Sequence, residues 1–306
     1  MQVHTLVTGS SGFLGTALVQ RLTAEGYSVD TLARKRGSIV ADLTERPPSL
    51  ERRAYDVVYH LAGKAHATAR TQEERAAFFA ANVVGTQHLL SALEKVTPPA
   101  RFVFVSTVAV YGLEAGEGLS EDTERAAQDP YGLSKRQAED LVADWGAHHG
   151  ISVSIVRLPL VAGRGAPGNL AAMVAAIRRG WYMGVGDGSN RRSIVDVSDV
   201  VAILPRIAER GDVFHLTDGV HPTFAEIELA IAAAMGRPAP PRIPLRAARW
   251  VANIGDRVES TTGYRFPLTS RALSKMTSTL TFNDARARRQ LGWAPQPALA
   301  AVRSWV

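Results

Sequence analysis

The first half of the chain alternates short apolar runs with longer stretches that carry apolar residues at helical spacing. The apolar runs predict strands over residues 3–8, 28–33, 39–40, 56–61, 101–106 and 153–158. The longer stretches predict helices over residues 12–25, 76–93 and 134–148. Short apolar strands between amphipathic helices are typical of a parallel sheet with helices on both faces. We therefore expect a doubly wound α/β domain over residues 1–160.

The pattern changes after Pro159. Glycine-rich loops are predicted at 163–168 and 184–190, helices at 170–179 and 224–235, a strand leading into a helix at 195–200, and a strand at 212–216. We expect residues 161–306 to form a smaller, discontinuous α+β lobe that binds the substrate. Segments near 190–217 are expected to return to the first sheet.

Composition narrows the class of protein. The chain has 306 residues, of which 46% are hydrophobic and 21% charged, as in a soluble globular protein with one large or two closely packed domains. It has no cysteine, which excludes a disulfide scaffold, a thiol nucleophile and a Cys-ligated metal site, and we expect no bound metal. No apolar run approaches the roughly 20 residues of a membrane span, and no signal-peptide pattern is present. We expect a cytoplasmic protein without membrane association.

The charge balance suits a small anionic ligand. The formal net charge is +6, but the basic residues are scattered, with only short clusters such as Arg34-Lys35-Arg36. A nucleic-acid interface needs a larger basic patch, so we do not expect a nucleic-acid partner. An anionic substrate or a phosphorylated cofactor fits this balance.

A glycine-rich turn joins the first predicted strand to the first predicted helix. Residues 8–15 read Thr-Gly-Ser-Ser-Gly-Phe-Leu-Gly, with glycines at Gly9, Gly12 and Gly15. Glycines at such a turn let the backbone approach a pyrophosphate, and the helix N-terminus offers it free N–H groups. A tight turn without a ligand is the alternative. The position between strand and helix favours a dinucleotide site, to which Phe13 and Leu14 also contribute.

Tyr131 and Lys135 lie four residues apart, so a helix places them on one face. A phenol with a pKa near 10 is a poor base at neutral pH, and a neighbouring ammonium stabilises its phenolate. The pair can therefore exchange a proton with an alcohol or a carbonyl. Upstream, the strand over 101–106 ends with Ser106 and Thr107, and one of these hydroxyls can bind the same substrate oxygen. Two surface residues on a helix would be the alternative for Tyr131 and Lys135.

Together these motifs resemble the short-chain dehydrogenase/reductase superfamily. The turn has its G-x-x-G-x-x-G spacing, and residues 56–63 and 82–90 resemble the fourth strand and the following helix of the extended branch, the NAD-dependent epimerase/dehydratase family. That branch contains nucleotide-sugar 4-epimerases, 4,6-dehydratases and 4-keto reductases with a Rossmann-type fold. The resemblance implies that Thr107 is the catalytic hydroxyl beside Tyr131 and Lys135. It also implies a homodimer, and it implies that Tyr131 and Lys135 contact the cofactor, with Lys135 holding its ribose. The further residues expected to contact the cofactor are Asp42, Leu43, Leu61, Ala62 and Gly63.

The end of the second strand selects the cofactor. An acidic residue there binds the ribose of NAD, whereas an arginine accommodates the 2′-phosphate of NADP. The position falls at Arg34, and Asp30 lies too early in the strand. We expect NADP, with NAD as the alternative and a solvated basic loop as the interpretation without a ligand.

The substrate-binding residues follow from the resemblance. It implies that Asn169 and Arg192 contact the diphosphate of a nucleotide sugar, that Arg271 supplies a second guanidinium, and that Ser106 contacts the substrate. Arginine suits diphosphate because its planar fork binds two phosphate oxygens. A solvent-facing Arg192 is the alternative.

The resemblance also bears on the reaction. The 4,6-dehydratases carry an Asp-Glu pair directly after the catalytic hydroxyl, where this chain has Val108 and Ala109, so dehydration is disfavoured. We expect a 4-keto reductase acting on a sugar linked to UDP. The alternatives are a 4-epimerase that retains NAD, a non-catalytic NADP-binding protein, and a reductase of a carbonyl without a nucleotide.

Overall fold

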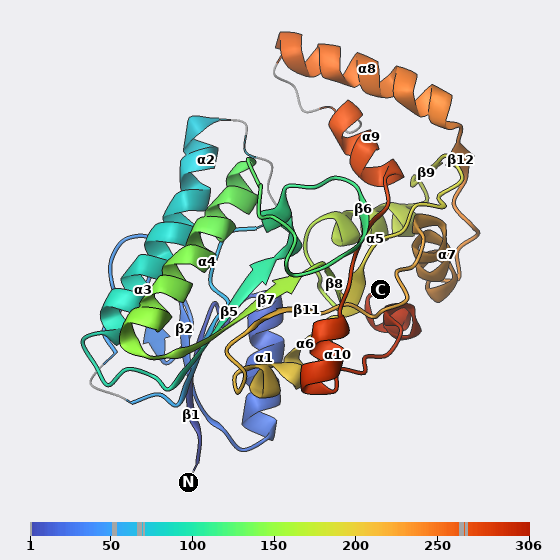
Figure 1. Cartoon of the computed structure of the whole chain (residues 1–306). Helices are drawn as coiled ribbons and strands as arrows, with labels where there is room; N and C mark the ends of the chain where they lie inside the picture. The colour runs from blue at the N-terminus through green and yellow to red at the C-terminus, as the bar shows by residue number, and fades with distance from the viewer. Residues whose placement is uncertain (1, 51–53, 66–68, 70, 263–265, 267–268) are drawn as a thin grey trace.

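The chain folds around a sheet of seven parallel strands (Figure 1). The computed structural model describes residues 2–50, 54–65, 69, 71–262, 266 and 269–306. The strands are β3 (Ile39–Val40), β2 (Ser28–Ala33), β1 (His4–Thr8), β4 (Val57–His60), β5 (Arg101–Thr107), β7 (Ser152–Leu158) and β11 (Val213–His215), in this spatial order. The order reverses between β1 and β4, which confirms the predicted doubly wound, Rossmann-type fold.

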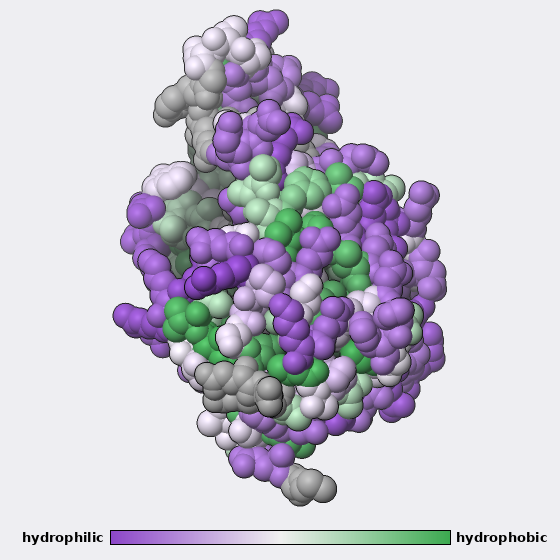
Figure 2. Space-filling view, turned by 90° about the vertical axis from the view of Figure 1, so that its left-hand side faces the viewer, coloured by the Kyte–Doolittle hydropathy of each residue, from purple (hydrophilic) through white to green (hydrophobic). Residues whose placement is uncertain are grey.

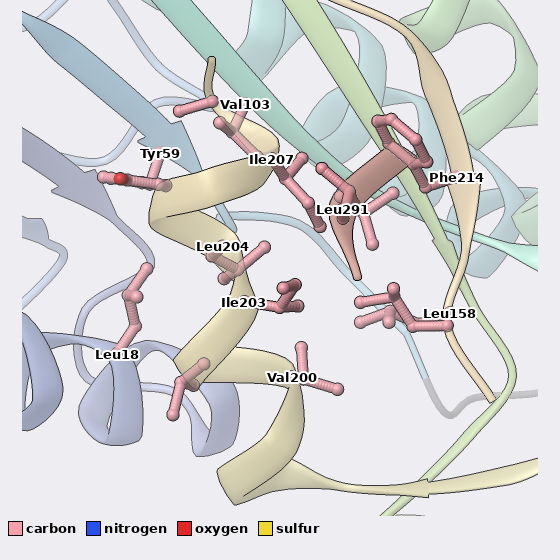
Figure 3. Packing of buried hydrophobic residues seen from close by; sticks show 14 of the residues in the cluster. Leu18, Tyr59, Val103, Leu158, Val200, Ile203, Leu204, Ile207, Phe214 and Leu291 are labelled. Carbon is pink, nitrogen blue, oxygen red and sulfur yellow. The ribbon is translucent and has the colours of Figure 1, made fainter. Parts of the chain in front are cut away.

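Both faces of the sheet are apolar and are covered by helices. Successive residues on a strand point to opposite faces, so Phe102 and Val103 pack into different clusters. On the Val103 side, Leu204 and Ile207 of α6 pack with Tyr59 of the sheet (Figure 3). The helices on that side are α1 (Phe13–Ala24), α6 (Val197–Ile207) and α10 (Ala285–Leu291); those on the Phe102 side are α3 (Gly85–Leu93) and α4 (Pro130–His149).

Two helices begin earlier than the sequence pattern predicts. The α4 helix begins at Pro130 and not at residue 134, because Asp129 caps it by accepting a hydrogen bond from the Gly132 N–H and a proline suits the first helical position. The helix expected from residue 76 begins with α2 (Gln72–Phe79), after a Thr71–Glu74 capping box. It continues through a π-helical turn (Ala80–Val84) into α3.

The continuous helix over Gln72–Leu93 is long and apolar enough by composition to cross a membrane. Within the described part of the chain it is the single helix of this kind. Its apolar residues Phe78, Leu89 and Leu93 are fully or almost fully buried in the protein. Core helices of globular domains can have the same composition, so the length and composition of this helix are weak evidence for a membrane span.

The second half of the chain, together with β6 from the first half, builds a lobe beside the C-terminal ends of the sheet strands (Figure 1). The two-stranded sheets are β8 (Leu160–Ala162) with β10 (Ile194–Asp196), β9 (Gly184–Val185) with β12 (Arg242–Ile243), and β6 (Gly116–Leu119) with β13 (Leu280–Phe282). Of the segments near 190–217, β11 joins the seven-stranded sheet, whereas β10 pairs with β8. The division of the chain at residue 160 stays a prediction.

The lobe also contains helices α5 (Asn169–Arg179), α7 (Phe224–Ala234), α8 (Leu245–Thr262) and α9 (Ser270–Thr277). The sequence pattern predicted no element over α8 and α9. These helices pack on each other and on β9 through Ala248, Ala252 and Leu273. The α8 helix forms the uppermost part of the molecule in Figures 1 and 2, and Figure 2 shows a mostly hydrophilic surface there.

Candidate active site

The glycine-rich turn is closed by contacts that only glycine permits. Gly9 has a positive φ of 66°, and its N–H donates to the Leu32 carbonyl at 2.9 Å. A Cβ on Gly9 would lie 2.7 Å from the Ala62 backbone nitrogen, and one on Gly15 would lie 2.1 Å from the Gly9 oxygen. The backbone of the turn therefore lies against residues 61–62, which follow β4. Both the turn and residues 61–62 were predicted to contact the same cofactor.

The N-terminus of α1 is free to bind an anion. Gly12 is its N-cap and supplies no side-chain hydrogen bond, and there is no acidic residue in the first turn. The N–H groups of a helix start that lack side-chain partners are donors for phosphate oxygens. The glycine cradle and this helix start fit the pyrophosphate of NAD(P). We infer that this turn would hold it.

The end of β2 carries exposed positive charge. Arg34, Lys35 and Arg36 are exposed, and none forms an ion pair with any residue that the structure describes. Hydrogen bonds from Thr44 lower the pKa of the Asp42 carboxyl, and the positive charge of Arg34 adds a smaller effect in the same direction. Asp30 is buried and accepts a hydrogen bond from the Tyr55 hydroxyl at 3.1 Å. Asp30 is therefore not available to bind the cofactor ribose, which agrees with its early position in the strand.

Thr107 and Tyr131 meet at the C-terminal end of β5. Thr107 is the last residue of that strand and caps the 3₁₀ turn Val108–Tyr111, where its Oγ1 accepts from the Ala109 N–H at 3.2 Å. Tyr131 lies in the first turn of α4, with its ring 5.9 Å from that of Phe78. Burial raises the pKa of Tyr131, and a hydrogen bond with the Thr107 side chain opposes this effect. The two hydroxyls are therefore close enough to bind one substrate oxygen.

Lys135 lies one helical turn after Tyr131 and is buried. Its Nζ donates to the Val105 carbonyl at 2.7 Å and lies 3.9 Å from the centre of the Phe104 ring. Burial lowers the pKa of Lys135 to about 7, and the charge of Glu139 opposes this shift. The structure thus brings the predicted Thr107, Tyr131 and Lys135 together at one strand edge. Their catalytic roles stay predictions.

Sequence reasoning missed the role of Asn82 in supporting this site. Asn82 lies in the π-helical turn, its Oδ1 accepts from the Lys64 N–H at 2.7 Å, and its Nδ2 donates to Ser134 Oγ at 2.9 Å. It thereby ties the segment after β4 to α4 between Tyr131 and Lys135. A polar residue inside an otherwise apolar helical run was the available signal.

The predicted substrate residues have different surroundings in this structure. Arg192 lies 5.8 Å from the centre of the Phe224 ring, and its guanidinium donates to the Lys275 carbonyl. Asn169 is exposed at the first position of α5. The Oγ of Ser106 is buried and has no hydrogen-bond partner among the described residues. The side chain of Arg271, within α9, lies outside the described part of the chain. These four roles stay predictions.

Comparisons with known proteins assign the family. Residues 5–216 match the NAD dependent epimerase/dehydratase family. A UDP-glucose 4-epimerase of Vibrio cholerae is 27% identical, covering 98% of this chain and 93% of that protein. A 4-hydroxy-2-methyl-3-oxo-4-farnesyl-3,4-dihydroquinoline-1-oxide ketoreductase of Stigmatella aurantiaca is 31% identical, covering 95% and 92%.

A solved structure extends the agreement to the lobe. The protein MoeE5, in complex with UDP-glucose and NAD, superposes with a TM-score of 0.74 at 25% identity, covering 98% of this chain and 96% of that one. The likeness spans both halves of the chain, and the family match covers the glycine turn and the Tyr131–Lys135 pair. This chain is an NAD(P)-dependent enzyme of the NAD-dependent epimerase/dehydratase family, the extended branch of the short-chain dehydrogenases/reductases.

Proposed function

We propose that the protein is an NADPH-dependent 4-keto reductase of a sugar linked to UDP. The observation that carries this proposal is the exposed basic cluster Arg34-Lys35-Arg36 at the end of β2, the strand whose Leu32 carbonyl accepts a hydrogen bond from the glycine-rich turn. Guanidinium and ammonium groups at that strand end favour a 2′-phosphate. A match to a ketoreductase supports the direction of the reaction, and the UDP-glucose complex of MoeE5 supports the substrate class.

Three residues share the transfer of a proton to the C4 oxygen, namely Tyr131, Thr107 and Lys135. The nicotinamide, when bound, supplies a hydride to the C4 carbonyl carbon. The C4 oxygen then gains negative charge, and the Tyr131 hydroxyl is placed to give it a proton. Thr107 holds the same oxygen through its hydroxyl, and the Lys135 ammonium stabilises the phenolate that Tyr131 becomes. The product is the 4-hydroxyl sugar, and solvent returns the proton to Tyr131.

The two positions after Thr107 lack the acid and the base that dehydration needs. Val108 and Ala109 follow Thr107 in the 3₁₀ turn, and neither side chain can carry a proton. The alternative is a 4-epimerase, which needs the same Thr107, Tyr131 and Lys135. The match to the Vibrio cholerae UDP-glucose 4-epimerase supports that alternative. The two reactions differ in whether the cofactor is consumed.

The balance of cofactor distinguishes these reactions. We expect the purified protein to release no stoichiometric NAD on denaturation, and to oxidise one NADPH for each UDP-4-keto sugar reduced. Chromatography of the released nucleotide and absorbance at the NADPH band measure both quantities. Arg192→Gln should raise KM for the UDP-sugar by about 10-fold or more while NADPH binding is unchanged, because it removes a bidentate phosphate contact. Tightly held NAD with interconversion of UDP-hexoses would instead establish the epimerase.

Arg34 carries the predicted cofactor preference. We expect Arg34→Ser to weaken NADPH binding by about 10- to 100-fold, as for a lost charge-assisted contact, and to leave NADH binding almost unchanged. Fluorescence titration with both nucleotides measures the two dissociation constants. Arg210→Ser removes an exposed arginine beyond α6 and serves as the control. Equal losses for NADPH and NADH would contradict the assignment of the 2′-phosphate to Arg34.

A further inference from the structure

A buried ion pair lies one helical turn behind the catalytic lysine. Glu139 follows Lys135 by four residues on α4, and its side chain is fully buried. Arg157 of β7 clamps it, with Nε 3.1 Å from Oε1 and Nη2 2.8 Å from Oε2. Arg125 approaches the same carboxylate from the segment before α4, at 3.1 Å, and its side chain is 32% exposed. The carboxylate is thus fixed between two guanidinium groups.

Arg157 is itself held by a hydrogen-bond chain of fixed direction. Its Nη1 donates to the Tyr111 hydroxyl at 2.8 Å, which lies 2.5 Å from His215 Nε2. His215 Nδ1 lies 3.1 Å from the Asn283 carbonyl, which can only accept, so Nδ1 carries the hydrogen and Nε2 accepts from Tyr111. Burial lowers the pKa of His215 to about 4, so the ring is neutral near pH 7. This series of hydrogen bonds holds the Arg157 guanidinium against Glu139.

Among the residues that the structure describes, few other charges face Lys135. On α4 these are Glu139 and, across Tyr131, the capping Asp129. The strand β5 presents the Phe104 ring and the Val105 carbonyl, and β4 presents His60, which burial keeps neutral with a pKa of about 3. The further cations are Arg157 and Arg125 behind Glu139, and Lys64 over the Phe78 ring. Glu139 is therefore the anion placed to favour the ammonium form of Lys135.

We propose that Glu139 is a positioning residue that acts through Lys135: the Arg157 clamp and Arg125 set how strongly its carboxylate supports the charge on Lys135. The clamp fixes the place of the carboxylate, while the two guanidinium groups offset part of its field. A buried ion pair with a purely structural role would leave the titration of Lys135 unchanged. The link to catalysis rests on the proposed function, whereas the link to Lys135 does not.

Two substitutions should move the titration of Lys135 in opposite directions. Glu139→Gln removes the supporting anion and should lower the midpoint by about one pH unit, as expected for a lost opposite charge nearby. Arg125→Gln removes a cation that offsets Glu139 and should raise the midpoint by a few tenths of a pH unit, roughly as for a partly screened charge. Arg125 is part-exposed, so this variant should fold even where Glu139→Gln does not. Arg210→Gln has the same net charge as Arg125→Gln and is the matched control.

The chain has five lysines, so isotope labelling of lysine side chains gives a countable NMR spectrum. The Lys135 signal is identified by its loss in Lys135→Met, and its pH titration is followed in each variant without any turnover. The expected result is a lower midpoint in Glu139→Gln and a higher one in Arg125→Gln than in Arg210→Gln. With active enzyme, the alkaline limb of the kcat profile should move with them. A Lys135 titration that is the same in Arg125→Gln and Arg210→Gln would overturn the proposal.

Discussion

Replacing Tyr131 with phenylalanine should lower kcat by about 10³- to 10⁴-fold, the upper range for loss of a general acid. The variant lacks the hydroxyl that gives its proton to the C4 oxygen, and Thr107 and Lys135 cannot replace it. The ring should keep its place beside Phe78, since the centroid distance of 5.9 Å involves the ring alone. NADPH affinity should change by about threefold or less, because the hydroxyl is not part of the phosphate cradle. Turnover under saturating substrate and cofactor titration measure both quantities.

The control for this variant is Tyr27→Phe. Tyr27 is a part-buried tyrosine directly before β2, away from α4. It should keep its wild-type kcat. A Tyr131→Phe enzyme with kcat within about tenfold of wild type would remove Tyr131 from the role of acid, since a general acid contributes more than that. Loss of NADPH binding together with kcat would instead assign Tyr131 to the cofactor site.

The sheet, the glycine-rich turn and the Tyr131–Lys135 pair were predictable because they depend on local sequence signals. Strands such as β5 are continuous apolar runs, and the glycine spacing between β1 and α1 can be seen in the sequence. The structure supplies the reason for that spacing, because a Cβ on Gly15 would lie 2.1 Å from the Gly9 oxygen. Tyr131 and Lys135 share a helix, so their spacing alone predicts a shared face. The start of α2 had a local signal too, the Thr71–Glu74 capping box, which the apolar periodicity did not include.

The parts of the fold and of the site that could not be predicted depend on contacts between segments that are distant in sequence. Arg157 and Glu139 are 18 residues apart, and the fold buries both only because β7 lies next to β5 and under α4. In sequence each reads as a charged residue within an element, with no sign of its partner. The buried residues of the α8 helix are the small Ala248, Ala252 and Gly255, whereas its large Trp250 is exposed. Periodicity of large apolar residues therefore does not detect it.

Replacing Gly15 with alanine should open the phosphate turn and strongly weaken cofactor binding. The methyl group would lie 2.1 Å from the Gly9 oxygen and 2.9 Å from the Ser10 Cα. Both are backbone atoms, which cannot relieve the clash by a change of side-chain rotamer. The turn would have to open, and with it the 2.9 Å hydrogen bond from the Gly12 N–H to the Gly9 carbonyl. We expect a loss of about 1–3 kcal/mol in the free energy of unfolding, as for an overpacked core. NADPH affinity should fall by about 100-fold or more, since small displacements of binding groups cost that much.

Gly26→Ala is a control that introduces an unfavourable backbone conformation without a steric contact like that between residue 15 and the Gly9 oxygen. Gly26 has a φ of 83°, but a Cβ there would meet no atom within 4 Å. An alanine at this position should cost about 1–2 kcal/mol through its left-handed backbone, while NADPH binding is preserved. Thermal unfolding and fluorescence titration of both variants give the comparison. Gly15→Ala that binds NADPH as Gly26→Ala does would show that the contact between Gly9 and Gly15 does not shape the phosphate site. Loss of binding in Gly15→Ala alone would place the dinucleotide on this turn, because the stability costs of the two substitutions are similar and only one changes the cradle.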